Sequence, residues 1–336
     1  MNSNPPRNIG IKCMSTCRKV FASFRLSSVL SMSIFMSCTS TGNGRLDSQQ
    51  RQVSEDDFGV LVMAHGGSRD WNAGVENSLA FIKAQYPVEI AFGMADAGSI
   101  EASTRKLEAQ GVKHVGVVRL FVSGESWYER TSQILGLEEG APKKPTDHDD
   151  ADTGHMRMAM GFWEIDTDLE FHMSKEGLAE AEEMDQVLLS RVRNLSTDPE
   201  SEVVAIIAHG PGDDAENERW ISEISERTAL LKKELGIADV KTFTLREDWR
   251  GKRETAEETI RDYVQSASLK GFTAIVVPFR VQGFGPYASV LEGLDYNADQ
   301  LGLTPHDNVA LWIQNQAEEL RKQATEHRTR LAQTDL

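Results

Sequence analysis

The stretch FGVLVMAHGG, residues 58–67, decides the fold that we expect for this chain. Five of the six residues from Val60 to His65 are apolar, and Gly59 and Gly66 bound the run. A short apolar run between turn residues is typical of a strand that is buried on both faces, as in a parallel sheet.

Helices and further strands alternate after this run. We expect helices over residues 71–85 and 99–110 and strands over residues 88–94 and 115–122. The order strand, helix, strand, helix, strand predicts a parallel sheet with right-handed crossover connections.

The same pattern returns in the second half of the chain. VVAIIAHGPG (203–212) mirrors the first run, and GFTAIVVPFRVQGFGPY (271–287) mirrors GVKHVGVVRLFVSGESWY (111–128). A tandem repeat of one structural unit is the simplest interpretation. We therefore predict an α/β fold with two lobes, each a parallel sheet flanked by helices, and a cleft between the lobes.

The predicted boundaries follow from composition. The segment 138–154 is rich in proline, glycine and acidic residues and indicates a surface loop. We expect a leader (1–38), a polar tether (39–56), a first lobe (57–137), an acidic linker with a connecting helix (138–200), and a second lobe that ends in a charged helix (201–336).

The first 50 residues differ from the rest, with six basic side chains and one acidic one. Residues 14–25 are basic, residues 26–36 are apolar with interleaved serines, and Ser37-Cys38 precedes a polar run. This order is that of a secretory signal. It also resembles a bacterial lipoprotein processing site, which implies export and a membrane tether through a lipid on Cys38. The alternative is a leader on a cytoplasmic protein.

Composition excludes several classes of function. The chain has 36 basic and 52 acidic side chains and a net charge of −16, so we expect no nucleic-acid partner. All three cysteines (Cys13, Cys17 and Cys38) precede the predicted lobes, which excludes a thiolate metal site or a cysteine nucleophile there. The first strand is followed by HGGS, which is neither of the glycine-rich nucleotide-binding motifs.

Two histidines are placed alike in the two lobes. His65 ends the first strand and is followed by Gly66, Gly67 and Ser68, and His209 with Gly210 stands at the same place in the second copy. Ligands bind beyond the carboxyl ends of the strands in open parallel sheets. An imidazole there can hold a metal ion or accept a proton near neutral pH. The alternative is that each histidine only hydrogen-bonds its loop.

Glu125 follows the third strand in the segment SGES and should lie at the same edge as His65. A carboxylate there can accept a proton or coordinate a divalent ion. The second copy has Phe284 at the matching position, so the two copies are not chemically equal.

Residues 60–137 resemble the class II chelatases, in particular the small sirohydrochlorin cobaltochelatases and ferrochelatases of the CbiX and SirB type. Residues 203–297 resemble a more diverged copy. The similar segments are AHGGSRDWN (64–72), EIAFGMAD (89–96), GVKHVGVV (111–118) and LFVSG (120–124).

The resemblance implies a lyase that inserts cobalt, iron or nickel into sirohydrochlorin or a related tetrapyrrole. It implies no permanently bound cofactor, because the divalent metal is a substrate. The family's histidine after the first strand maps to His65, and its second histidine maps to Glu125. We thus expect one working site with His65 and Glu125 as catalytic and metal-binding residues. Substrate contacts would come from Gly66, Gly67, Ser68, His209 and Gly210.

An acidic tetrapyrrole needs basic and aromatic neighbours. Candidates near the predicted strand ends are Arg69, Arg119, Arg246, Arg280, Trp71, Trp127, Tyr128, Phe284 and Tyr287. One alternative is an exported tetrapyrrole- or metal-binding protein that has lost turnover. Another is a periplasmic binder of some other small molecule, which would not require a histidine after both first strands. The sequence does not indicate the oligomeric state.

Overall fold

The computed structural model describes residues 57–145 and 160–334, all of which belong to one compact unit. The predicted leader, the lipid site at Cys38 and the tether lie outside the described residues, as does much of the acidic loop.

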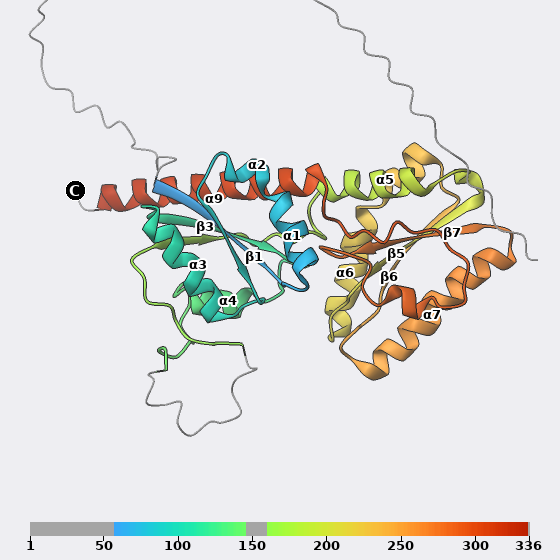
Figure 1. Ribbon diagram of the computed structural model, residues 1–336, viewed down its shortest axis with the longest axis horizontal. Helices are drawn as coiled ribbons and strands as arrows, with labels where there is room; N and C mark the ends of the chain where they lie inside the picture. Colours follow the sequence, from blue (N-terminus) through green and yellow to red (C-terminus); the bar gives the residue numbers. More distant parts are fainter. Residues whose placement is uncertain (1–56, 146–159, 335–336) are drawn as a thin grey trace, which may run out of the picture. The chain divides into compact units, whose positions relative to one another are not determined.

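The first sheet has four parallel strands in the order β2-β1-β3-β4. Figure 1 shows helices on both of its faces. The strands are β1 (Phe58–Ala64), β2 (Val88–Phe92), β3 (His114–Leu120) and β4 (Glu170–Met173). The helices of this half are α1 (Arg69–Ser78), α2 (Ala80–Lys83), α3 (Ala97–Ala109) and α4 (Tyr128–Ile134).

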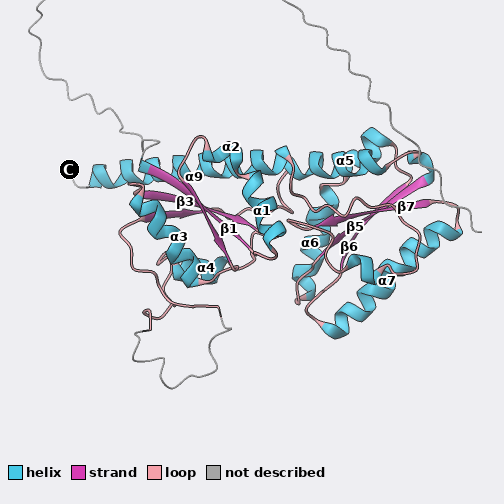
Figure 2. Cartoon of the chain, in the orientation of Figure 1, coloured by secondary structure: helices cyan, strands magenta, loops and turns pink. Residues whose placement is uncertain are grey.

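The second sheet has three parallel strands in the order β6-β5-β7. Figure 2 shows it as a separate group of arrows, also covered by helices. The strands are β5 (Glu202–Ala208), β6 (Asp239–Thr244) and β7 (Thr273–Phe279). The helices are α5 (Glu183–Leu195), η3 (Pro199–Ser201), α6 (Asp214–Glu226), the π-helix η4 (Leu231–Leu235), α7 (Arg250–Leu269), α8 (Tyr287–Val290) and α9 (Asp307–Thr334).

Strand order makes the repeat visible. In both sheets the first strand lies between the second and the third, so β5 matches β1. All strand pairs within each sheet are parallel, and parallel neighbours need crossover connections. The predicted fold class, two α/β lobes with parallel sheets, is confirmed.

The core follows the two-residue period of the strands. Val60 and Val62 of β1 face a cluster that also contains Val204 and Ile206 of β5, whereas Leu61 and Met63 face a separate cluster beneath α3. Helices α5, α6 and α9 contribute to the first cluster, which is therefore shared by both sheets. The outer face of the second sheet has a third cluster beneath α7.

Two elements differ from the boundaries drawn on the sequence. Strand β4 lies in the segment interpreted as linker and connecting helix, yet it pairs with β3 and completes the first sheet. Helix α9, assigned to the second lobe, contacts β3 and β4 of the first sheet as well as α5. The first sheet needs an apolar cover over β3, and α9 supplies it with residues such as Leu320 and Ala324.

Within the described part of the chain, none of the helices is both long enough and apolar enough to cross a membrane.

Candidate active site

A cavity of about 500 Å³ lies at the carboxyl ends of the strands, between loops of the two lobes. A volume of this order suits a small-molecule ligand. From the first lobe it is lined by residues that follow β1, β2 and β3, and from the second lobe by residues that follow β5, β6 and β7. Of the residues predicted to act in catalysis or to contact substrate, His65, Glu125, His209 and Gly210 lie on its walls.

The turn after β1 orients His65. The backbone turns at Gly66 with φ +81°, and Nδ1 of His65 lies 2.7 Å from the Gly66 carbonyl oxygen. Because a carbonyl oxygen only accepts, Nδ1 carries the proton and Nε2 keeps its lone pair. Among the described residues, none forms a hydrogen bond or ion pair with Nε2, so this atom is available as a ligand or proton acceptor.

Gly67 and Ser68 do not line the cavity and are used locally. The Gly67 N–H donates to Oδ1 of Asn72 at 2.9 Å, and Oγ of Ser68 accepts from the Trp71 N–H at 3.2 Å as the N-cap of α1. These bonds position the turn that carries His65. Gly66, which was also predicted to contact substrate, likewise has a role in backbone geometry.

The turn after β5 repeats this geometry around His209. Nδ1 of His209 lies 2.9 Å from the Gly210 carbonyl oxygen, and Gly210 has φ +79°. The other ring nitrogen differs, because Nε2 of His209 lies 3.1 Å from Oδ2 of Asp248. That contact is an ion pair when the imidazole is protonated. The two histidines are thus equivalent in backbone setting and different in chemistry.

Glu125 lies in the loop after β3 and is held by an arginine of the second lobe. Its Oε2 is 2.7 Å from Nη2 of Arg219 on α6, and both side chains are at least half exposed. An exposed pair of this kind contributes little to stability, because solvent screens it. The pair does neutralise the carboxylate that the sequence assigned to metal binding and proton transfer.

Arg119 is a framework residue and not a cleft cation. It is buried at the end of β3, where its guanidinium donates to four backbone carbonyls, those of Gly124, Ser126, Ser174 and Lys175. Burial lowers the pKa of Arg119 to about 10. The side chain also lies over the Tyr128 ring, 4.6 Å from its centroid. It therefore fixes the loop that presents Glu125.

Of the other predicted basic residues, one lines the cavity, one is buried in the framework and one is exposed away from the cavity. Arg280 lines the cavity and pairs with Glu247. Arg246 is buried and donates to the Gly212 carbonyl at 2.7 Å and to Asp214 at 2.8 Å. Arg69 is exposed at the start of α1 and does not line the cavity.

Aromatic side chains form much of the wall. Trp71 and Trp127, two of the aromatic candidates, line the cavity, and the sequence reasoning missed Trp220 and Trp249. His65 lies 6.5 Å from Trp71 and His209 lies 6.2 Å from Trp249, measured between ring centroids. Tyr128, Phe284 and Tyr287 do not line it, and the last two are buried in the core beneath α7.

Arg219, Glu216 and Asp248 are the charged neighbours that sequence reasoning missed. Each follows the carboxyl end of a strand in the second copy, and the sequence repeat predicts that these ends face the same site as those of the first copy. The described residues contain one group of three metal-ligating side chains, and it includes neither His65 nor Glu125.

Solved structures give the comparison for this architecture. SirB from Bacillus subtilis with Fe3+ is 16% identical, with a TM-score of 0.53, and the match covers 79% of this chain and 96% of that chain. The sirohydrochlorin chelatase SirB from Bacillus subtilis subspecies spizizenii, in complex with cobalt, is 15% identical with a TM-score of 0.50 and the same coverage.

No protein-family model matches the chain, and a search of curated proteins gives no match. At such low identity the likeness to SirB concerns the fold. The chain therefore has a class II chelatase-like fold.

Proposed function

We propose that the protein inserts a divalent metal ion into sirohydrochlorin or a related tetrapyrrole in the cavity between its lobes. The proposal is supported at the level of fold by the likeness to SirB. The observation that carries it is the cavity itself, in which His65, Glu125 and His209 line one space. Cobalt, iron and nickel are the candidate metals.

The proposed chemistry exchanges one divalent cation for two pyrrole protons, so charge is conserved. His65 is suited to hold the incoming cation or to accept a proton, because the bond from Nδ1 to Gly66 leaves Nε2 free. The tryptophan walls offer flat apolar surfaces for the macrocycle. Arg280, which also pairs with Glu247, offers N–H donors for its carboxylates, and His209 lines the same space.

Metal insertion by the full-length chain tests the proposal. Sirohydrochlorin is mixed with Co²⁺, Fe²⁺ or Ni²⁺ without oxygen, and the absorption change is followed with and without protein. We expect the wild-type protein to insert metal faster than the spontaneous reaction. In His65→Ala the protein-dependent part of the rate should fall by about 100-fold or more. Glu129→Gln, an exposed glutamate outside the cavity, is the control. Insertion at the wild-type rate by His65→Ala would overturn the assignment.

A carrier that binds a tetrapyrrole without turnover is the second candidate. The contact that favours it is the ion pair between Glu125 and Arg219, which occupies the carboxylate that would assist metal entry. A carrier would give a spectral shift on ring binding and no acceleration of insertion.

Arg219→Gln separates the two candidates because it releases Glu125 without changing that residue. In a chelatase the variant should insert metal faster or bind it more tightly than wild type, with an unchanged unfolding midpoint. In a carrier the variant should leave the insertion rate at the spontaneous value.

We also propose that the chain is exported and tethered by a lipid at Cys38. The motif before this cysteine supports the proposal. Mass spectrometry of the protein purified from its own cells checks it. A processed, acylated amino terminus at Cys38 is expected, and an intact leader in a cytosolic fraction would overturn it.

A further inference from the structure

We infer that the protein has a second divalent-metal site, of the zinc class, built from His114, Glu170 and His172 and completed by His327. These residues lie outside the candidate active site, and the inference does not rest on the proposed function. The site would fasten α9 to the first sheet.

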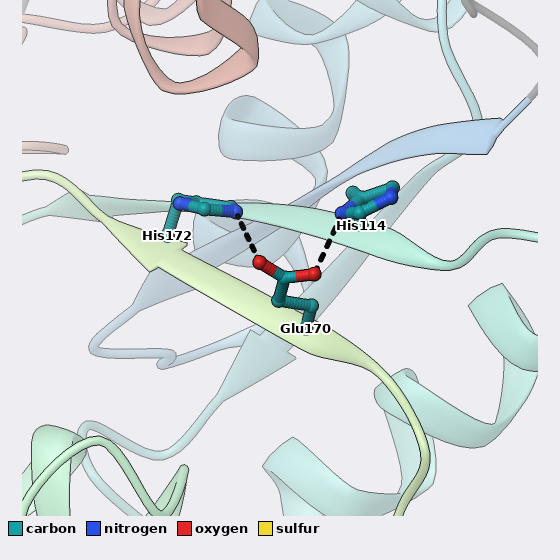
Figure 3. Close-up of side chains that lie close together, drawn as sticks. All are labelled: His114, Glu170 and His172. Atoms are coloured by element: carbon teal, nitrogen blue, oxygen red, sulfur yellow. Dashed lines mark ion pairs between the residues drawn. The ribbon is translucent and has the colours of Figure 1, made fainter. Parts of the chain in front are cut away.

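Strand register brings the first three residues together. In the parallel pair of β3 and β4, His114 is the partner of Glu170, and Gly116 is the partner of His172. Side chains two residues apart share a face of a strand, so Glu170 and His172 point to the same side. Figure 3 shows both imidazoles turned toward the carboxylate between them.

The fourth side chain comes from the helix that covers this face. A Cβ placed on Gly116 would lie 3.2 Å from Cβ of Leu320, which shows that α9 crosses here. Two turns further along α9, Nε2 of His327 lies 3.4 Å from Oε1 of Glu170. The His172 and His327 rings are 6.2 Å apart between centroids.

The separations match a metal centre better than a hydrogen-bonded cluster. Nδ1 of His114 is 3.3 Å from one Glu170 oxygen, and Nε2 of His172 is 3.7 Å from the other. Ligand atoms bound tetrahedrally to zinc at about 2.0–2.1 Å lie about 3.3–3.4 Å from one another. All three ligand atoms of this set lie within 4.8 Å of one another.

Three buried atoms in this cluster lack hydrogen-bond partners among the described residues. They are Nδ1 of His114, Oε1 of Glu170 and Nε2 of His172. Buried polar atoms are normally satisfied, and leaving several unpaired in one place is costly. A cation would satisfy all three at once. The His327 side chain is about half exposed, which leaves a path for the ion to enter.

The ligand set selects the class of metal. Imidazole nitrogens with one carboxylate suit zinc and the neighbouring transition metals better than calcium or magnesium. Four protein ligands leave no open position, which is the pattern of a structural site. His114 and Glu170 begin their strands, whereas His65 follows the end of β1. The site therefore lies at the amino-terminal ends of the strands, opposite to the carboxyl ends where the cavity lies.

Zinc binding by the full-length chain tests the inference. The His65→Ala background removes a cleft ligand, and each protein is stripped with a chelator and titrated with Zn²⁺ by calorimetry. We expect one ion per chain and a raised unfolding midpoint. His172→Ala should abolish both the binding and the rise in the unfolding midpoint. His327→Ala, which removes the half-exposed ligand, should weaken binding about tenfold or more. Gln323→Ala, exposed on the same helix, should bind as the background does.

Hydrogen exchange of the peptide that covers residues 320–330 tests the fastening role. Zn²⁺ should slow exchange there in the background protein and not in His327→Ala. The metal site is overturned if the background protein binds no Zn²⁺, or if His172→Ala and His327→Ala bind it as tightly as Gln323→Ala. Binding without a change in exchange would overturn the fastening of α9.

Discussion

Arg119 shapes the candidate site although it does not line the cavity. Its guanidinium ties the loop of Gly124 and Ser126 to the segment of Ser174 and Lys175. Buried arginines need every N–H paired, and four carbonyls supply the partners. The position of Glu125 thus depends on a cation at the end of β3.

Arg119→Lys should therefore be costly. Lysine keeps the charge but cannot reach four carbonyls, so we expect a loss of about 3 kcal/mol in the free energy of unfolding. Urea unfolding measures it. The exposed Arg69→Lys should stay within about 0.5 kcal/mol of wild type. An equal effect of the two substitutions would contradict this role.

Glu176 gives a second prediction, in which pH is the variable. Burial raises the pKa of this carboxyl, against hydrogen bonds from Trp312 and Gln316 that lower it. The folded state thus holds the proton more tightly than the unfolded state, whose pKa is near 4.5. The stability from protonation is complete below that value and is lost as pH rises through the folded pKa.

Glu176→Gln imitates the protonated carboxyl at every pH. We expect the variant to match wild type near pH 4 and to be the more stable of the two at pH 7.5. Urea unfolding at a series of pH values gives the difference directly. A difference that does not grow with pH would contradict the raised pKa.

The sequence reveals residue type and strand position, but it does not reveal what a side chain will contact. His65 and His209 could be placed at strand ends because the strands before them are unmistakably apolar. Arg119 could not be separated from Arg280 in this way, because both follow apolar strand residues. Only the fold shows that one is enclosed by carbonyls and the other lines a cavity.

At the scale of elements, the turns after β1 and β5 need glycine. Gly66 and Gly210 have positive φ values, where a side chain costs roughly 1–2 kcal/mol. The surroundings differ. A Cβ at Gly66 would lie 3.1 Å from Cβ of Phe92, and a Cβ at Gly210 only 2.6 Å from Cβ of Thr244.

The stability lost on substitution by alanine should increase with this crowding of the added Cβ. We expect Gly210→Ala to destabilise more than Gly66→Ala. Gly111→Ala is the matched control because Gly111 has φ +85° with nothing within 4 Å of the added carbon. It should cost only the backbone strain. Thermal unfolding of the three variants gives the ranking, and a larger loss at Gly111 than at Gly210 would refute it.

Element prediction succeeded where patterns are long and failed where they are short. The strands of both repeats have apolar runs that no helix period explains. Strand β4 has only four residues, and two of them, Glu170 and His172, are polar. Its pairing with β3 is fixed by long-range register, so the sequence could not reveal the metal-ligating cluster either.

At the scale of the molecule, α9 joins parts that are distant in sequence. Trp312 and Leu320 belong to the cluster that contains Phe58 of β1 and Phe279 of β7. Trp312 is fully buried and donates its indole N–H to Glu176 at 2.8 Å. The two sheets should consequently unfold together.

Trp312→Ala tests this coupling. A buried tryptophan replaced by alanine loses about 3–5 kcal/mol of stability. We expect that loss in one transition, seen at the same urea concentration by fluorescence and circular dichroism. Leu311→Ala, at a neighbouring position that is 45% exposed, should change little. Two separate transitions in wild type would contradict the coupling.

The packing of α9 also has a consequence for biosynthesis. Strand β3 is translated long before the helix that covers it, because the whole second sheet lies between them. At about 5–20 residues per second, Val118 and Leu120 stay uncovered for roughly 10–40 s while the rest of the chain is synthesised. During that interval the nascent chain cannot close its first sheet and presents an apolar surface. We expect chaperones that bind apolar surfaces to act on the nascent chain in this interval.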